Sequence, residues 1–291
     1  MLGTGSLMNT GLFRPRSVDE AIELLARLPE AKILSGGATL VAMINARLIE
    51  PLALISLADV GELAGVTGSP GGGWRIGAMT RHRDVAAETR FTGTLGLVQQ
   101  AASLIANATV RNMGTIGGAI AHADPGLDYP PALVAADATI EVASGAGRRR
   151  IPAQDFFVDW YTTALGSGEL VVAVHLPPAQ PGAGVYHKFA RVSGDYATVS
   201  VAISISAAAN GARARAAVGA CGPAPVLLDE ANALLSGRPG EADIARAGEL
   251  LAAAADPVDD VRGSAGYRRL LIPRMLARAF AEARAGMGAR Q

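Results

Sequence analysis

Cysteine is almost absent from this sequence of 291 residues, which contains only Cys221. A single cysteine excludes an internal disulfide, and it excludes an iron–sulfur or zinc site held by several thiolates. The four histidines, His82, His122, His175 and His187, form neither an HExxH motif nor a pair spaced by four residues. We therefore expect no metal site on this chain.

An excess of charge of either sign is absent as well, because 26 basic residues balance 26 acidic ones. A neutral chain lacks the positive field that attracts proteins to nucleic acids or to acidic membranes. Aromatic residues make up only 4% of the chain, which leaves few rings for stacking on bases. Since half of the residues are hydrophobic, we expect a folded protein that has no nucleic-acid partner.

Long apolar runs are also missing, since no stretch of about 18 uncharged apolar residues could span a membrane. The first 15 residues lack the charged and apolar regions of a secretory signal peptide. These two observations predict a cytoplasmic protein.

The elements that the sequence does contain predict a mixed α+β chain. Ser17 and Glu20 are spaced as a capping box before a helix with apolar positions at helical spacing. Further helices are expected over residues 40–48, 80–88, 97–106, 227–235, 242–255 and 267–284, and strands over 31–35, 52–57, 74–79, 138–142, 170–175, 185–189, 198–206 and 212–220. The glycines and prolines of residues 109–131 predict a long irregular loop.

A segment rich in proline and glycine, residues 177–182, predicts a linker between two domains. We expect an N-terminal domain over residues 1–176, divided into two subdomains near residues 56–60, and a smaller C-terminal domain over residues 177–291. A chain of this length usually folds as two units with separate cores.

Two glycine pairs lie where ligand-binding turns are expected. The first pair belongs to the segment Ser35, Gly36, Gly37, Ala38, Thr39 and Leu40, and the second to Thr115, Ile116, Gly117 and Gly118. Glycine lets a backbone approach a ligand closely, and exposed N–H groups of such turns bind phosphate. Either glycine pair, taken alone, could equally belong to an ordinary turn that binds no ligand. The spacing matches neither the Walker motif nor GxGxxG, and no GxSxG elbow is present.

The segments around these glycine pairs resemble those of a known family. Residues 35–40 are similar to its first pyrophosphate loop, A/S-G-G-x-S/T-L, and residues 110–118 to its second, V-R-N-x-G-T-I-G-G. The second loop continues through Asp124 and Asp128 in an A-x-A-D-P-x-x-D pattern. On these motifs the chain resembles the FAD-binding medium subunit of the molybdenum hydroxylases, which include bacterial carbon monoxide dehydrogenase and xanthine dehydrogenase.

Two later segments extend the resemblance over nearly the whole chain. Residues 186–197 are similar to the family's Y-x-K-x-x-R…G-D-x-A strand, and residues 260–268 to its D-x-R-x-S-A-x-Y-R motif. Ala119 departs from the family pattern, which has asparagine or serine there, and Leu227 stands where the family's G-P-x-P-x-R motif commonly has arginine.

The resemblance implies a two-subdomain FAD-binding fold of the vanillyl-alcohol-oxidase (PCMH) type, followed by a small α/β C-terminal domain. It implies one non-covalent FAD on this chain and no catalytic residue for oxidation of an organic substrate. A large subunit with a molybdopterin cofactor and a small subunit with 2Fe-2S clusters would be the partners, in a dimer of heterotrimers. The chain would then take electrons from the clusters and pass them to an external acceptor.

Four further residues are candidates for contacts with the flavin nucleotide. Asp128 could accept a hydrogen bond from a ribose hydroxyl, or could only cap its own loop. His122 could touch the isoalloxazine ring, or serve as a structural hydrogen-bonding residue. Lys188, one of only two lysines in the chain, could stabilise an anionic reduced flavin, or be a solvated strand residue. Thr80 could approach the flavin in addition to capping a helix.

Two other functions remain open at this point. The first alternative is a stand-alone FAD-dependent oxidase of the related fold, although the C-terminal domain is small for a substrate domain. The second is a non-catalytic nucleotide-binding or assembly module. For the glycine turns, we expect a valine at Gly37 or Gly117 to fill the space of phosphate oxygens and to resist a positive φ.

Overall fold

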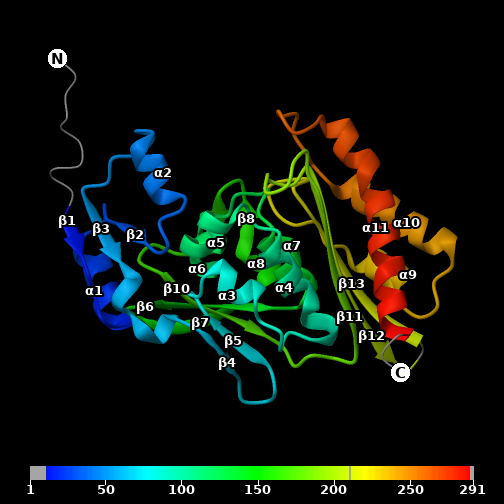
Figure 1. Cartoon of the computed structure of the whole chain (residues 1–291), viewed down its shortest axis with the longest axis horizontal. Coiled ribbons are helices and arrows are strands. Elements are labelled where there is room, and N and C mark those ends of the chain that lie inside the picture. Colours follow the sequence, from blue (N-terminus) through cyan, green and yellow to red (C-terminus); the bar gives the residue numbers. More distant parts are fainter. Residues whose placement is uncertain (1–10, 210, 289–291) are drawn as a thin grey trace.

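The structure is a computed structural model and describes residues 11–209 and 211–288. Three sheets follow one another along the longest axis of the molecule, in the order of the sequence (Figure 1). The N-terminal sheet lies at one end, a larger sheet with helices above it lies in the middle, and a third sheet carries the last helices at the other end.

The N-terminal sheet is parallel and small. Its strands β1 (Gly11–Phe13), β3 (Ala53–Ser56) and β2 (Lys32–Leu34) pair in that order, and helices α1 (Val18–Arg27) and α2 (Leu40–Asn45) make the connections. Ser17 caps α1 as expected, because its hydroxyl accepts a hydrogen bond from the N–H of Glu20. The Glu20 carboxylate bonds the N–H of Arg16, one residue earlier than a capping box requires.

The central sheet is antiparallel and contains five strands. They pair in the order β4 (Val66–Gly68), β5 (Trp74–Gly77), β10 (Leu170–Leu176), β6 (Thr139–Ser144) and β7 (Gly147–Pro152). Above the sheet lie α3 (His82–Ala86), α4 (Gly96–Ser103), α5 (Ala108–Met113), α6 (Ile116–His122) and α7 (Tyr129–Ala135) (Figure 1). The short helix α8 (Ala153–Phe156) leads into a hairpin of β8 (Phe157–Asp159) and β9 (Thr162–Thr163).

The prediction of an irregular loop over residues 109–131 is wrong, because α5, α6 and the start of α7 lie there. Each helix begins at a residue that favours a helix start. The side chains of Asn107 and Thr115 accept hydrogen bonds from N–H groups in the first turns of α5 and α6. Two prolines occupy the first turn of α7, where a missing N–H does no harm. The glycines and prolines therefore mark helix boundaries here.

The third sheet is an antiparallel meander of β11 (Gly182–Phe189), β12 (Val199–Ala208) and β13 (Gly211–Gly219). Its side chains alternate between two cores. Val201 and Ile203 of β12 face a core formed with α9 (Asp229–Leu235), α10 (Glu241–Ala254) and α11 (Ala265–Gly288), whereas Ala202 joins the core of the central sheet. The sheet thus forms a wall with helices on both faces (Figure 1).

Short 3₁₀ turns complete the described chain at Leu57–Asp59, Gly61–Leu63 and Gly93–Leu95. Within residues 11–209 and 211–288, no helix has the length and apolar character needed to cross a membrane. The mixture of helices and strands predicted from the sequence is confirmed.

Candidate functional site

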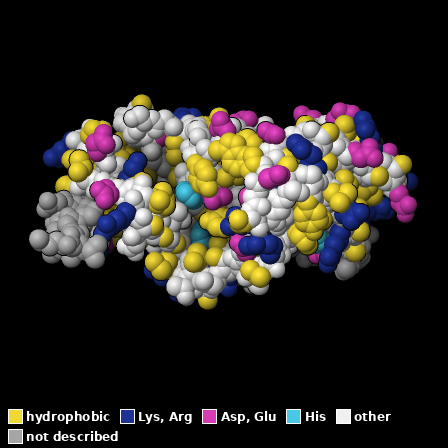
Figure 2. Space-filling view, turned by 90° about the horizontal axis from the view of Figure 1, so that it is seen from above, with side chains coloured by type: hydrophobic (Ala, Val, Ile, Leu, Met, Phe, Trp, Pro, Cys, Tyr) yellow, Lys and Arg dark blue, Asp and Glu magenta, His cyan; other side chains and the backbone are white. Residues whose placement is uncertain are grey.

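A large cavity of about 1030 Å³ opens where the three sheets meet. Its wall takes residues from the end of β2, from α5 and α6, from the start of β10 and from the end of β11. Figure 2 shows the molecule from above, with histidine and hydrophobic side chains near the middle of the face and many charged side chains toward the C-terminal end. A cavity of this volume can enclose a cofactor.

Most of the residues expected to contact the flavin nucleotide line this one cavity. They come from segments that lie far apart in the sequence: Ser35, Gly36, Gly37, Ala38, Thr39, Leu40, Thr115, Gly117, Gly118, His122, Asp128 and Lys188. Ala119, which departs from the family pattern, also lines the cavity, and its methyl group provides no hydrogen bond there.

The first glycine turn has backbone N–H groups that are available to a ligand. Among the described residues, the N–H groups of Gly36, Gly37, Ala38 and Thr39 have no acceptor. Gly37 has φ +80°, a conformation that a β-branched residue resists, as expected. A Cβ on Gly36 would lie 1.9 Å from the carbonyl oxygen of Met113, so only glycine lets these two segments meet. This turn can therefore present several N–H groups to a phosphate.

The second glycine turn is different, because its donors are used inside the chain. The N–H groups of Ile116 and Gly117 donate to the carbonyls of Thr80 and Ala78, and that of Gly118 donates to the Thr115 hydroxyl. A Cβ on Gly117 would lie 2.5 Å from the Cβ of Ala78. The expectation that a valine at Gly117 would fill the space of phosphate oxygens is therefore wrong. The valine would collide with the protein backbone in the β5–α3 connection, whether or not a ligand is bound.

A direct hydrogen bond joins the two turns. The hydroxyls of Ser35 and Thr115 are 2.6 Å apart, and the Ser35 hydroxyl also lies 2.9 Å from the sulfur of Met79. Since Thr115 at the same time caps α6, its hydroxyl fixes the start of that helix relative to the first turn. Both turns consequently face the same cavity.

Thr80 and Ile116 are the two predicted residues that do not line the cavity. Thr80 is buried, and its hydroxyl donates to the carbonyl of Gly65 at 3.0 Å. It does not cap a helix, since α3 begins at His82 with Arg81 at the N-cap position. The side chain of Ile116 is fully buried in the core beneath α6. Both residues support the site from behind its wall.

Asp128 and Lys188 form an ion pair in the cavity wall, and both side chains are buried. The Asp128 carboxylate accepts a hydrogen bond from the Tyr186 hydroxyl at 2.6 Å and one from the Lys188 ammonium at 3.0 Å. Burial raises the pKa of Asp128, against the opposing effects of Lys188 and Tyr186. The side chain makes no capping hydrogen bond at the start of α7. Each carboxylate oxygen has one partner within the chain and keeps a lone pair for a further donor, such as the ribose hydroxyl expected from the resemblance. Lys188 is not a solvated strand residue.

Two histidines line the cavity, and burial lowers the pKa of both. His82 is buried with its Nδ1 3.2 Å from the Tyr129 hydroxyl, and its pKa falls to about 4, with a smaller contribution from Arg111. His122 is half-buried beside the ring of Tyr161, and the charge of Asp124 only partly opposes the lowering of its pKa. Both rings are therefore uncharged at neutral pH.

The cavity wall also contains residues that the sequence analysis did not propose, among them Leu170, Val171, Tyr161 and Tyr196. Leu170 and Val171 read as ordinary strand residues, and nothing in the sequence places β10 against a glycine turn. Tyr161 lies in the β8–β9 hairpin and has φ +52°, an uncommon value for a tyrosine. Tyr196 belongs to a motif that the resemblance had singled out, and that signal could have found it.

These residues fit a flavin nucleotide better than a metal ion. Within the described ranges no three His, Cys, Asp or Glu side chains gather as a metal site would require. The cavity instead combines unpaired N–H groups at Gly36–Thr39, an apolar wall and a buried cation, which suit a phosphorylated aromatic ligand.

Two family descriptions match consecutive parts of the chain. Residues 8–179 match the FAD binding domain in molybdopterin dehydrogenase. Residues 184–283 match the CO dehydrogenase flavoprotein C-terminal domain.

Individual relatives are similar over most of their length. The carbon monoxide dehydrogenase medium chain of Hydrogenophaga pseudoflava is 34% identical over 91% of this chain and 94% of its own. The 6-hydroxypseudooxynicotine dehydrogenase complex subunit alpha of Paenarthrobacter nicotinovorans is 36% identical, covering 92% of each chain.

Solved structures of the same kinds of enzyme are similar to this chain as well. A chain of carbon monoxide dehydrogenase from Hydrogenophaga pseudoflava superposes with a TM-score of 0.91 at 34% identity, covering 95% of this chain and 98% of that one. Quinoline 2-oxidoreductase from Pseudomonas putida 86 gives 0.88 at 33% identity, covering 96% and 98%. With its two glycine turns facing one cavity, this chain belongs to the flavoprotein subunits of the molybdenum hydroxylases and carries their FAD-binding domain.

Proposed function

We propose that this chain is the electron-transfer subunit of a heteromeric molybdenum-containing dehydrogenase. It takes electrons from iron–sulfur clusters on a small partner subunit and passes them through its FAD to an external acceptor, while a large molybdopterin subunit oxidises the substrate. The observation that carries this proposal is the cavity of about 1030 Å³ onto which both glycine turns open. The 2Fe-2S clusters belong on a partner because one cysteine cannot hold them, and the molybdopterin is assigned to a partner by the family resemblance.

Each part of the cavity has a distinct task in this proposal. The N–H groups of Gly36–Thr39 bind the diphosphate, and the Ser35–Thr115 hydrogen bond holds the second turn against the first. Lys188 places a positive charge in the wall, where it favours a negatively charged reduced ring. The rings of His82 and His122 are uncharged, so they place polar nitrogen atoms in the cavity wall without adding charge. When bound, FAD supplies the ability to accept two electrons and release them singly.

Asp128 acts here through Lys188, whose ammonium it orients and whose charge it partly neutralises. We assign no residue of this chain a role in oxidising an organic substrate. The dimer of heterotrimers, the cytoplasmic location and the division of the chain at residue 177, with a further division near residues 56–60, are parts of the same proposal.

The test is to purify the full-length chain, reconstitute it with FAD and measure both binding and turnover. We expect a flavin spectrum, slow reduction of artificial dyes by a chemical or nicotinamide donor, and no oxidation of organic substrates. Co-expression with the genes for a large and a small partner should give a complex that contains molybdenum and 2Fe-2S clusters. Substrate oxidation by the isolated chain, free of molybdenum and iron, would instead establish the stand-alone oxidase.

A further inference from the structure

A second, much smaller cavity of about 120 Å³ lies directly beside the large one. Tyr161 and Tyr196 line both cavities, so their side chains form the partition between the two. Tyr196 lies on the loop that connects β11 with β12, and the residue is 37% exposed. Its ring packs on the backbone at Gly126, where an added Cβ would lie 3.0 Å from a ring carbon. A larger residue there would press on the ring and require it to shift.

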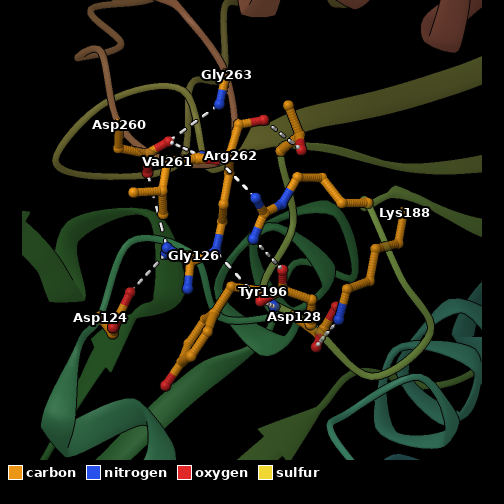
Figure 3. Close-up of polar contacts among 12 residues, drawn as sticks. Asp124, Gly126, Asp128, Lys188, Tyr196, Asp260, Val261, Arg262 and Gly263 are labelled. Atoms are coloured by element: carbon orange, nitrogen blue, oxygen red, sulfur yellow. Dashed lines mark hydrogen bonds and ion pairs between the residues drawn. The ribbon is translucent and has the colours of Figure 1, made fainter.

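Arg262 lies over the Tyr196 ring. Its guanidinium carbon lies 5.0 Å from the ring centroid, within the range of a cation–π interaction. The same guanidinium donates from Nε to the Asp195 carboxylate at 3.3 Å, and that carboxylate in turn accepts the N–H of Tyr196 at 2.8 Å. Arg262 therefore holds both the ring of Tyr196 and the backbone that carries it (Figure 3).

Arg262 is itself fixed by a buried arginine. Asp260 accepts hydrogen bonds from the N–H groups of Arg262 and Gly263 and from Arg268. Arg268 is only 4% exposed, and its Nη1 donates to the carbonyls of Thr198 and Ala220 at 2.8 and 2.7 Å. Thr198 completes this network of hydrogen bonds, because its hydroxyl donates to the carbonyl of Arg262 at 3.2 Å. The segment before α11 is thus anchored to β12 at the point where the Tyr196 loop ends.

From these contacts we propose that Arg262 is a positioning residue, which holds Tyr196 as a fixed wall of the flavin cavity and so limits how fast FAD leaves and how far solvent reaches it. The inference rests on the proposed flavin site. In this proposal the motif at residues 260–268 acts on the flavin cavity indirectly. Asp260 and Arg268 fix Arg262, and Arg262 fixes Tyr196. Removing the guanidinium would take away both the cation over the ring and the donor that holds Asp195.

The experiment compares Arg262→Gln with the wild type and with Arg246→Gln, which removes one arginine from an exposed ion pair on α10. FAD is bound to each full-length chain. The rate of FAD release and the quenching of flavin fluorescence by iodide are then measured, and thermal unfolding of the FAD-free chains serves as a check of folding. We expect about tenfold faster release and stronger iodide quenching for Arg262→Gln, partial rescue by Arg262→Lys, and wild-type behaviour for Arg246→Gln.

Asp195→Asn provides an independent variant, because it weakens the hold on Tyr196 while Asp260 and Arg268 stay in place. If Arg262→Gln fails to fold, faster release in Asp195→Asn than in the wild type still supports the proposal. Wild-type release and wild-type quenching in the folded variants would overturn it. Failure of the wild-type chain to bind FAD would overturn the proposed function instead, so that the two failures are distinguishable.

Discussion

The Lys188 ammonium lies 3.0 Å from a carboxylate oxygen of Asp128, 60 residues away in the sequence. The two side chains are only 7% and 6% exposed, so water solvates neither charge well. The Tyr186 hydroxyl and the Leu104 carbonyl supply the remaining close partners. Such a pair adds little net stability when intact, but either charge is costly to bury once its partner is gone.

The ion pair leads to a prediction about stability. Lys188→Met leaves the Asp128 carboxylate buried without a cation, and we expect it to lower the free energy of unfolding by about 3–5 kcal/mol. Urea denaturation of the FAD-free chain measures this change. Arg246→Met, which breaks the exposed pair with Glu249, should cost less than about 1 kcal/mol. Equal losses in the two variants would contradict a buried role for Lys188.

A second prediction tests the first glycine turn without disturbing its packing. Thr39 is exposed to the cavity, and among the described residues its hydroxyl has no hydrogen-bond partner. Thr39→Val keeps the shape and removes the hydroxyl, so we expect FAD affinity to fall about threefold to tenfold, as one lost hydrogen bond predicts. Fluorescence titration with FAD measures this.

The matched control is Thr67→Val, on the exposed face of β4 and outside the cavity. Its affinity for FAD should equal that of the wild type, and thermal unfolding should be similar for both variants. Unchanged affinity in Thr39→Val would remove this hydroxyl from the binding site. Valines at Gly36 or Gly117 are poorer tests, since both positions touch backbone atoms of this chain.

His82 gives the protein a predictable pH dependence. Its pKa is about 4 in the folded chain, because burial penalises the charged ring, against 6.5 as the ordinary value. As the pH falls below 6.5 the unfolded chain binds the proton first, so this contribution to stability is complete above pH 6.5 and lost progressively down to pH 4. The loss is on the order of 3 kcal/mol.

Denaturant unfolding at a series of pH values checks this contribution. Between pH 6.5 and pH 4, the wild type should lose more stability than His82→Gln. His187→Gln changes a histidine paired with exposed Glu282 and should retain the wild-type slope that His82 causes. Identical pH profiles for wild type and His82→Gln would show that His82 does not titrate as the structure indicates.

Cys221 should be chemically silent in the folded protein. The thiol is buried, and burial raises its pKa to about 12, against the opposing charges of Arg268 and Arg269. A thiol reagent such as DTNB should therefore label the native chain only at the rate of unfolding, and label the urea-unfolded chain at once. Rapid reaction of native protein would mean that the β13–α9 connection opens locally.

Several features of this protein follow from its sequence alone. Ser17 carries the side-chain oxygen that a helix start requires, and Gly37 permits the positive φ that its turn adopts. The motifs at residues 35–40 and 110–118 led to the family, and they lie on one cavity as the resemblance implied. These are local properties, set by a few neighbouring residues and readable from their order.

Tertiary structure decided what the sequence left open. Residues 109–131 became helices because Thr115 and the prolines at the start of α7 sit at capping positions within a packed layer, which composition alone does not reveal. Asp128 lies beside Lys188 because α7 packs against the third sheet. Burial of the two side chains then makes their ion pair part of the structure. Tyr196 became a cavity wall because Arg262 and Gly126 meet around it from distant segments. Such contacts depend on which surfaces the whole chain buries, a long-range balance that no short motif encodes.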